Sequence, residues 1–382
     1  MSSRAEYRDV RKAGWKGCRF DMPAGGAYSR SMIRIGIIGT GSMAATHARS
    51  FAAMRGVSLS ACCDIDGEKA KSFARRWNIP RWYADAAEML ESETLDGVAI
   101  VTTDVMHAPL SLAAIARGIA VLCEKPLATT LADARRMRDA AAKHNVPAMV
   151  NFSYRNSAGA QAAAVLVRGG GIGRIMHVEA SYLQSWLAQA AWGDWRTDPR
   201  FTWRLSTAHG SAGTLGDIGC HIYDLVSLIC GDIASITCRL STFSKGIAGD
   251  RIGPYVLDAN DSFVSTIQLA GGGIGTVHAT RWATGHHNSI RVRVYGDEGA
   301  VDVDLDRDPK SYRVVKGRAA VRKPQWRDVP CKPVPTQYER FVKSIRTRTN
   351  DPSDFANGTR IQAYLDASVR SDKERRPLRI RP

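Results

Sequence analysis

The chain has 382 residues, more than one hydrophobic core usually supports, so two domains are expected. Its 44% hydrophobic and 24% charged residues are typical of a globular enzyme and exclude a disordered or fibrous chain, and no apolar run reaches membrane-spanning length. The formal net charge of +16 would suit nucleic acid, but Arg and Lys are dispersed without a basic block, which argues against that partner. An anionic substrate or a cofactor pyrophosphate would still be attracted.

Residues 1–31 are polar and basic, and they lack both hydrophobic periodicity and the apolar middle of a signal peptide. We expect a mobile leader without a functional role, with Met32 as a candidate natural start. The eight cysteines show no CxxC pair and no zinc-like spacing with histidine. They predict reduced, buried thiols in a cytoplasmic protein without a metal site.

From residue 33 to about 150, short β-branched runs alternate with amphipathic helical patterns, which is typical of parallel βαβ units. The expected strands are Ile33–Ile38, Val57–Cys63, 97–101, Ala120–Cys123 and 148–152. The expected helices between them are 44–54, 68–77, 109–117 and Leu131–His144. This pattern predicts a doubly wound parallel sheet of the Rossmann type over residues 32–150.

A glycine-rich GxGxxA motif over residues 39–44 directly follows the first expected strand. Gly39 permits a tight turn, Gly41 lets a pyrophosphate approach the backbone, and Ala44 allows close helix packing. Such a motif between a strand and a helix predicts a dinucleotide site. Its expected cofactor contacts are Gly39, Gly41, Ser42 and Met43.

Asp64 ends the second expected strand, about twenty residues past the motif, where a dinucleotide site places a carboxylate against the adenosine ribose. The next residues, Ile65, Asp66 and Gly67, include no cation that would accept a 2′-phosphate. The predicted cofactor is therefore NAD and not NADP. The alternative is that Asp64 only opens a turn, a common use of Asp near Gly.

After residue 155 the pattern changes. A helix at Ala158–Arg168 and a strand at Ile175–Gln184 precede a Trp-rich connection, 186–203, and a helix at 214–230. Further alternating segments predict strands at 233–243, Ser262–Leu269, 274–282, 290–295 and 300–305, followed by helices at 336–347 and 358–371. The expected second α/β domain, 151–382, contains a large, mainly antiparallel, open-faced sheet. Few helices follow to cover that sheet, and an uncovered apolar face would pair subunits into a homodimer or homotetramer.

The segment Cys123-Glu124-Lys125-Pro126-Leu127 stands at the end of the fourth expected strand. Together with the GxGxxA motif, it resembles the EKP motif of the Gfo/Idh/MocA family, named for glucose-fructose oxidoreductase, inositol dehydrogenase and a rhizopine catabolism protein. The likeness extends from residue 32 to about 380, essentially the whole chain beyond the leader.

Further positions match or depart from the family pattern. Matches are found at Thr102, His107, Tyr154, Arg155 and in segment 213–224, which contains Asp217 and His221. Departures are Thr103 and Asp104, where the family usually has Pro-Asn, and Ala158, where a proline often follows the Tyr-Arg pair. These departures affect the shape of the nicotinamide pocket and not the reaction class.

The resemblance implies roles for individual residues. Cofactor contacts would extend to Thr102, His107, Glu124 and Lys125. Substrate contacts would come from Lys125, Tyr154, Arg155, Trp203, Arg204, Asp217 and His221. Two alternatives stay open, because Arg155 could equally form an interdomain ion pair and the tryptophans could be packing material. His286 and His287 are interpreted as loop residues.

Oxidation of a secondary alcohol needs a proton acceptor and groups that stabilise the developing alkoxide. Our hypothesis makes His221 the acceptor, lets Asp217 hold the hydroxyl and polarise His221, and has Lys125 lower the alcohol pKa. Spacing of four residues would put Asp217 and His221 on one helix face. Either Lys125 or His221 could be the base, and without the motif context both Asp217 and His221 could be structural.

The sequence therefore predicts an NAD-dependent dehydrogenase that oxidises a secondary hydroxyl of a sugar, sugar derivative or cyclitol. Two alternatives stay open: an NAD-using sugar dehydratase or glycosidase of the same family, and a non-catalytic dinucleotide-binding sensor. Joint presence of Lys125, Asp217 and His221 argues against the sensor. The sugar, the carbon oxidised and the direction of the reaction are not predicted.

Overall fold

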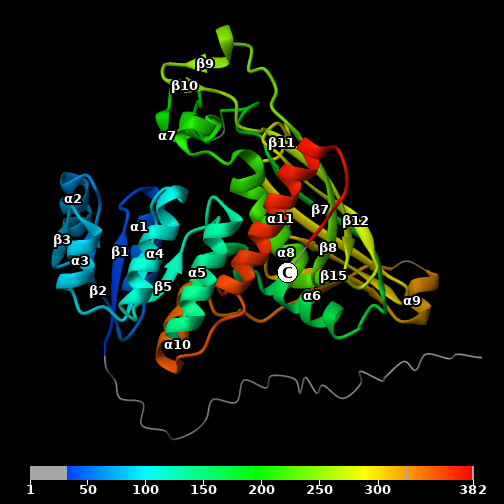
Figure 1. Ribbon diagram of the computed structural model, residues 1–382. Helices are drawn as coiled ribbons and strands as arrows, with labels where there is room; N and C mark the ends of the chain where they lie inside the picture. The colour runs from blue at the N-terminus through cyan, green and yellow to red at the C-terminus, as the bar shows by residue number, and fades with distance from the viewer. Residues whose placement is uncertain (1–31, 191, 324, 381–382) are drawn as a thin grey trace, which may run out of the picture.

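The computed structural model of the chain describes residues 32–190, 192–323 and 325–380, so the expected leader lies outside the described residues. Two sheets form the framework, one in each half of the molecule (Figure 1). No helix in the described ranges has the length and apolar character needed to cross a membrane.

The first sheet has six parallel strands in the order β3-β2-β1-β4-β5-β6. The strands are β1 (Ile33–Ile38), β2 (Val57–Cys63), β3 (Arg81–Tyr83), β4 (Gly97–Ile100), β5 (Ala120–Cys123) and β6 (Ala148–Val150). The apolar side chains of β1, β4 and β5 are almost wholly buried, as expected for a parallel sheet covered on both faces. The predicted Rossmann sheet is confirmed, and its strand order reverses between β1 and β4, where open α/β sheets bind ligands.

Five helices connect these strands. They are α1 (Ser42–Ala52), α2 (Gly67–Trp77), α3 (Ala86–Ser92), α4 (His107–Ala116) and α5 (Leu131–His144). Side-chain caps begin several of them, as where Asp66 accepts from the Lys69 N–H and Thr130 accepts from the Asp133 N–H. By contrast, α1 has Gly41 as its N-cap residue, without a side-chain cap and without an acidic residue in the first turn, so the first N–H groups of the helix are available to an anion.

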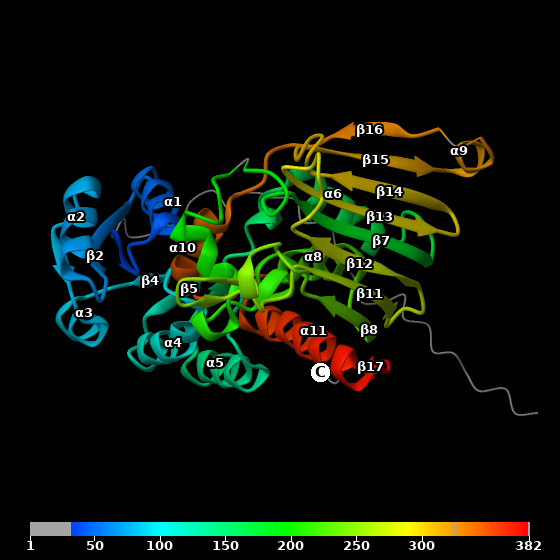
Figure 2. The same cartoon turned by 90° about the horizontal axis from the view of Figure 1, so that it is seen from above.

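The second sheet has nine strands in the order β16-β15-β14-β13-β7-β12-β11-β8-β17. They are β7 (Ile175–Gln184), β8 (Ile233–Ser241), β11 (Ser262–Leu269), β12 (Ile274–Thr280), β13 (Asn288–Gly296), β14 (Gly299–Asp304), β15 (Ser311–Lys316), β16 (Arg327–Pro330) and β17 (Leu378–Arg379). Among them only β7 and β12 pair in parallel, which confirms the mainly antiparallel sheet. Helices α6 (Ala158–Arg168), α8 (Cys220–Cys230) and α11 (Phe355–Glu374) pack on one face (Figure 2).

Within the described residues no helix covers the other face of this sheet, as expected, but this face is largely polar and not the apolar face that we expected. Its outward positions carry charged pairs, such as Arg291 with Asp302 at 2.6 Å and Arg293 with Glu179 at 3.2 Å. The alternation of the strands sends most apolar side chains inward, and Val264 and Ile274 are exposed exceptions at outward positions. Pairing of subunits through this face stays a prediction, now without an apolar driving force.

Segments from the end of the chain return to the Rossmann sheet. Helix α10 (Gln337–Thr347) packs against α1, and α11 packs against α5 and β6. The backbone N–H of Val150, the last residue of the edge strand β6, donates to the carbonyl of Ser353 at 2.8 Å. The last two helices of the expected second domain, 151–382, therefore pack in space against the first domain.

A smaller layer lies above the junction of the two halves (Figure 1). It includes α7 (Pro199–Thr202), the hairpin β9 (Arg251–Ile252) and β10 (Tyr255–Val256), and their connections, whereas the short α9 (Arg318–Arg322) lies at the far end of the second sheet. This layer has its own apolar cluster of Trp186, Leu187, Trp195, Leu205 and Leu257. The cluster holds the chain around residues 203–205 over the junction.

Candidate active site

A cavity of about 630 Å³ lies between the Rossmann domain and the second domain. It opens at the carboxyl ends of β1 and β4, where the strand order of the first sheet reverses. Most of the residues expected in the site line it, namely Gly39, Gly41, Ser42, Met43, Asp64, Thr102, Glu124, Lys125, Trp203, Arg204 and Asp217. Its volume lies within the range of cofactor and ligand sites.

The glycine loop has the shape that a dinucleotide needs. Gly39 has a φ of +91°, and a Cβ there would lie 2.5 Å from the carbonyl oxygen of Val101. Gly41 lines the cavity and has open space where a side chain would stand, next to the uncapped N-terminus of α1. A pyrophosphate fits this cradle, because its charge would meet free N–H groups and no side chain would obstruct it.

Asp64 has two tasks at the next strand end. Its Oδ2 accepts from both the N–H and the hydroxyl of Thr40 at 2.8 Å, and its Oδ1 accepts from the N–H of Asp66 at 3.1 Å. The bond with Asp66 is the turn role that the alternative gave to Asp64, whereas the bonds with Thr40 hold the glycine loop, and the carboxylate also lines the cavity. Since Oδ1 has one lone pair left, it offers one further acceptor position for a ribose hydroxyl.

Two expected cofactor contacts, His107 and Glu124, are engaged in hydrogen bonds with other parts of the protein. His107 is fully buried and does not line the cavity, because its Nδ1 contacts the carbonyl of Pro126 at 2.8 Å and its Nε2 the carbonyl of Thr102 at 3.3 Å. Glu124 lines the wall, but its carboxylate is bonded to His47 at 2.8 Å and to the Asn151 amide at 2.7 Å. His107 therefore joins two cavity loops and does not reach the cofactor space.

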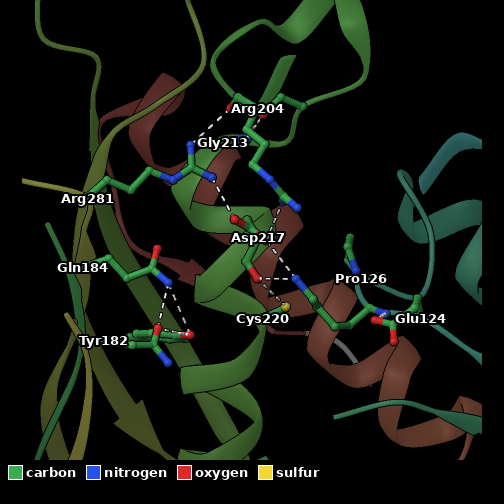
Figure 3. A network of polar contacts seen from close by, with 12 residues as sticks. Glu124, Pro126, Tyr182, Gln184, Arg204, Gly213, Asp217, Cys220 and Arg281 are labelled. Carbon is green, nitrogen blue, oxygen red and sulfur yellow. Dashed lines mark hydrogen bonds and ion pairs between the residues drawn. The ribbon is translucent and has the colours of Figure 1, made fainter. Parts of the chain in front are cut away.

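Asp217 is the centre of the polar network (Figure 3). Lys125 Nζ donates to Asp217 Oδ1 at 2.8 Å and to its backbone carbonyl at 3.0 Å. Arg281 Nη2 donates to Oδ2 at 3.0 Å, and Arg204 Nη1 makes a longer contact of 3.4 Å with Oδ1. One carboxylate thus holds three cations from three separate segments of the chain.

The charges of this network fix its protonation. Burial alone would lower the pKa of Lys125, but the charge of Asp217 outweighs it and holds that pKa above its ordinary value. Burial alone would raise the pKa of Asp217, yet the charges of Lys125, Arg204 and Arg281 hold it well below its ordinary value. At neutral pH Lys125 is therefore an ammonium ion, suited to stabilising an alkoxide and not to accepting a proton.

The helix that carries Asp217 differs from the expected single helix at 214–230. Residues Leu215–Gly219 form a turn of π-helix, and regular α8 begins at Cys220. A wider turn changes the angle between side chains four residues apart. No hydrogen bond joins Asp217 to His221 among the described residues, so the expected polarisation of His221 by Asp217 is not part of this geometry.

His221 lies in an aromatic pocket beside the network. Its ring meets Tyr154 at 4.8 Å, Phe152 at 6.1 Å and Tyr182 at 6.3 Å between centroids. Its Nδ1 is buried without a hydrogen-bond partner. Burial, and next the charge of Lys125, lower the pKa of His221 to about 3, so its imidazole is neutral at pH 7 and a weak base. His221 does not line the cavity.

This pKa predicts a dependence of stability on pH. The unfolded chain binds a proton at His221 near pH 6.5 and the folded protein only near pH 3, so acid favours the unfolded state between these values. Wild type should lose about 2 kcal/mol more unfolding free energy than His221→Gln between pH 7 and pH 5. Urea denaturation at both pH values would measure the unfolding free energies. Equal losses in wild type and His221→Gln would contradict the lowered pKa of His221.

The other expected substrate contacts separate into two groups. Trp203 and Arg204 line the cavity, whereas Tyr154 does not, since its hydroxyl is bonded to Tyr182 at 2.5 Å and to the Asn288 amide at 3.0 Å. The structure does not bring Arg155 to the cavity. Its buried guanidinium forms two hydrogen bonds of 2.7 Å with Asp224, so Arg155 is part of an ion pair, as the alternative reading held. That pair lies within the second domain and does not cross to the first.

Sequence reasoning missed Arg281, which follows directly after β12. Its side chain is fully buried, donates to Asp217 and to the carbonyl of Arg204, and lies over the ring of Trp186. A signal existed, since Arg281 continues the inward alternation of Val277 and Ala279. A charged residue at an inward strand position needs a partner, which indicates a site.

Two family models match the chain. The description "Oxidoreductase family, NAD-binding Rossmann fold" applies to residues 33–152, and the Gfo/Idh/MocA C-terminal domain to residues 160–302. With both sheets and the glycine cradle in place, the protein is an NAD-binding oxidoreductase. It belongs to the Gfo/Idh/MocA family, and the resemblance seen in the sequence is confirmed.

Curated relatives and solved structures agree with this assignment. A levoglucosan dehydrogenase of Pseudarthrobacter phenanthrenivorans is 29% identical over 298 residues, 72% of this chain and 74% of that protein. A D-apiose dehydrogenase of Paraburkholderia graminis is 26% identical over 90% of this chain and 89% of its own length. A levoglucosan dehydrogenase in complex with NADH and levoglucosan superposes with a TM-score of 0.81 at 26% identity, covering 92% of this chain and all of that chain.

Proposed function

We propose that the protein is an NAD-dependent dehydrogenase that oxidises a secondary hydroxyl of a sugar, sugar derivative or cyclitol. The observation that carries the proposal is the Lys125 ammonium, held by Asp217 in the same cavity as the glycine loop. Relatives named for levoglucosan and D-apiose support a sugar as the substrate.

Each group then has a defined task. NAD, when bound, supplies the hydride acceptor. Lys125 donates a hydrogen bond to the reacting hydroxyl and stabilises the negative charge that grows on its oxygen, while Asp217 keeps the ammonium in position. His221 is assigned as the acceptor of the hydroxyl proton, which requires the proton to reach an imidazole beside the cavity whose surroundings hold its pKa at about 3. Arg204 and Trp203 contact the rest of the substrate.

A substrate screen tests this function. Levoglucosan, D-apiose, inositols, common aldoses, D-glucuronate and D-glucose 6-phosphate are incubated with NAD while NADH absorbance is recorded. We expect at least one compound to give NADH in a 1:1 ratio to oxidised product. Product formation without NADH accumulation would instead indicate a dehydratase or glycosidase, and NADH binding without turnover of any compound would indicate a sensor.

The preference for NAD over NADP gives a second prediction. Asp64 would repel a 2′-phosphate, so kcat/KM should favour NAD by about tenfold or more, roughly 1.4 kcal/mol. Asp64→Asn should bring the kcat/KM values for NAD and NADP closer together. Asp66→Asn is the matched control, since Asp66 lies two residues away outside the cavity lining and should keep the wild-type ratio. Equal kcat/KM for both cofactors in the wild-type protein would refute the assignment.

A further inference from the structure

Arg204 reaches into the cavity with most of its hydrogen-bonding capacity unused. Its guanidinium has five N–H groups, and the 3.4 Å contact of Nη1 with Asp217 is its one hydrogen bond among the described residues. Its side chain is about one-third exposed and lines the cavity beside Asp217. Figure 3 shows its side chain above Asp217.

The backbone under this guanidinium is firmly held. The carbonyl of Arg204 accepts from Arg281 Nη1 at 3.1 Å and from the Ser211 hydroxyl at 2.5 Å. The guanidinium lies 4.8 Å from the centre of the Trp203 ring, which restricts its plane. Arg281 also holds Asp217, so one buried side chain sets the distance between Arg204 and the reaction centre. A planar fork held in this way is preorganised for a planar or tetrahedral oxyanion.

The charges near Arg204 do not by themselves select the ligand. Lys125, Arg204 and Arg281 share the carboxylate of Asp217, and Asp104 and Glu124 line the same cavity. Glu124 keeps its negative charge despite burial, because its bonds to His47 and Asn151 hold its pKa at about 2. An anion is favoured by the guanidinium of Arg204 itself, a charged planar fork whose N–H groups stay largely unused in the cavity.

We propose that the substrate carries an anionic group, a carboxylate or a phosphate monoester, and that Arg204 binds this group while Lys125 contacts the hydroxyl to be oxidised. This inference rests on the proposed dehydrogenase function and narrows its substrate class. The substrate would then be a sugar acid or a sugar phosphate and not a neutral sugar. Arg204 is a binding residue in this account, and Arg281 is a positioning residue.

The first test compares matched ligands without turnover. D-Gluconate and D-glucitol differ mainly by carboxylate against hydroxymethyl, and each is titrated by calorimetry into the protein saturated with NADH. We expect gluconate to bind about 10- to 100-fold more tightly, and Arg204→Gln to abolish that ratio. Arg196→Gln is the matched control, because Arg196 also lies over a tryptophan, 4.5 Å from the Trp195 ring, but does not line the cavity. Equal affinity of the wild-type protein for the two ligands would overturn the proposal.

The second test uses kinetics to separate the possible sources of the anion. D-Glucose, D-glucuronate and D-glucose 6-phosphate are compared as substrates in wild type and Arg204→Gln. A higher kcat/KM for the carboxylate or for the phosphate, lost in the variant, identifies the group. Weaker NADH binding in Arg204→Gln, with no change in these ratios, would overturn the proposal by assigning Arg204 to the cofactor pyrophosphate. Faster oxidation of the neutral sugar would also overturn it while leaving the dehydrogenase function intact, whereas no NADH from any sugar, with selective gluconate binding, would contradict only that function.

Discussion

Replacing Lys125 with methionine is expected to lower kcat by about a hundred- to ten-thousand-fold while the Kd for NADH changes little. The ammonium contacts Asp217 and faces the reacting hydroxyl in our account, whereas the cradle for the pyrophosphate is made by the glycine loop. Methionine fills a similar volume without charge. Single-turnover kinetics and a fluorescence titration with NADH measure the two quantities.

A control variant and a second site variant complete this test. Lys69→Met, at a surface ion pair with Asp66, should leave kcat unchanged. His221→Ala should also be strongly impaired if the imidazole takes the proton. Near wild-type kcat in both Lys125→Met and His221→Ala, with normal NADH binding, would mean that the Lys125-Asp217 pair is structural.

Arg155→Met is expected to reduce the free energy of unfolding by about 3–5 kcal/mol. Arg155 and Asp224 are both buried, and the substitution would leave the Asp224 carboxylate with the amide of Asn357, at 2.8 Å, as its remaining hydrogen-bond partner among the described residues. An uncompensated buried charge is far more costly than the loss of an exposed pair. Urea denaturation followed by circular dichroism measures the change.

Two comparisons separate the buried charge from the loss of a long side chain. Arg136→Met removes an exposed pair with Asp133 and should change stability by about 0.5 kcal/mol or less. A double variant, Arg155→Met with Asp224→Leu, removes both charges and should recover part of the loss. A loss below about 1 kcal/mol in Arg155→Met alone would show that Asp224 finds another partner or takes up a proton.

The central strands of the Rossmann sheet were predictable because their buried runs are continuous and β-branched. The edge strand β3 and helix α3 were not, since Arg81–Tyr83 is short and largely exposed and so carries no apolar pattern. The two sheets confirm the predicted fold class. The open face of the second sheet shows the limit of this reasoning, because strand number predicts an uncovered face but not its polarity.

The site residues also include some that the sequence predicts and some that it does not. Local motifs located Gly39, Gly41, Asp64 and Lys125 at the cavity, because their backbone positions follow from strand ends. Contacts between distant segments were not accessible from local pattern. Arg155 could be matched to a motif, yet only its burial beside Asp224 shows an ion pair.

The return of α10 and α11 to the first sheet affects the order in which the molecule can be completed. The ribosome delivers residues 32–150 first, but the Val150 N–H has its bonding partner at Ser353, about two hundred residues later. At about 5–20 residues per second, the nascent Rossmann domain would wait on the order of ten seconds or more for its last helices. During synthesis, two surfaces stay exposed: the edge at β6 and the apolar faces that α10 and α11 later cover. A chaperone that binds exposed apolar surface would bind there.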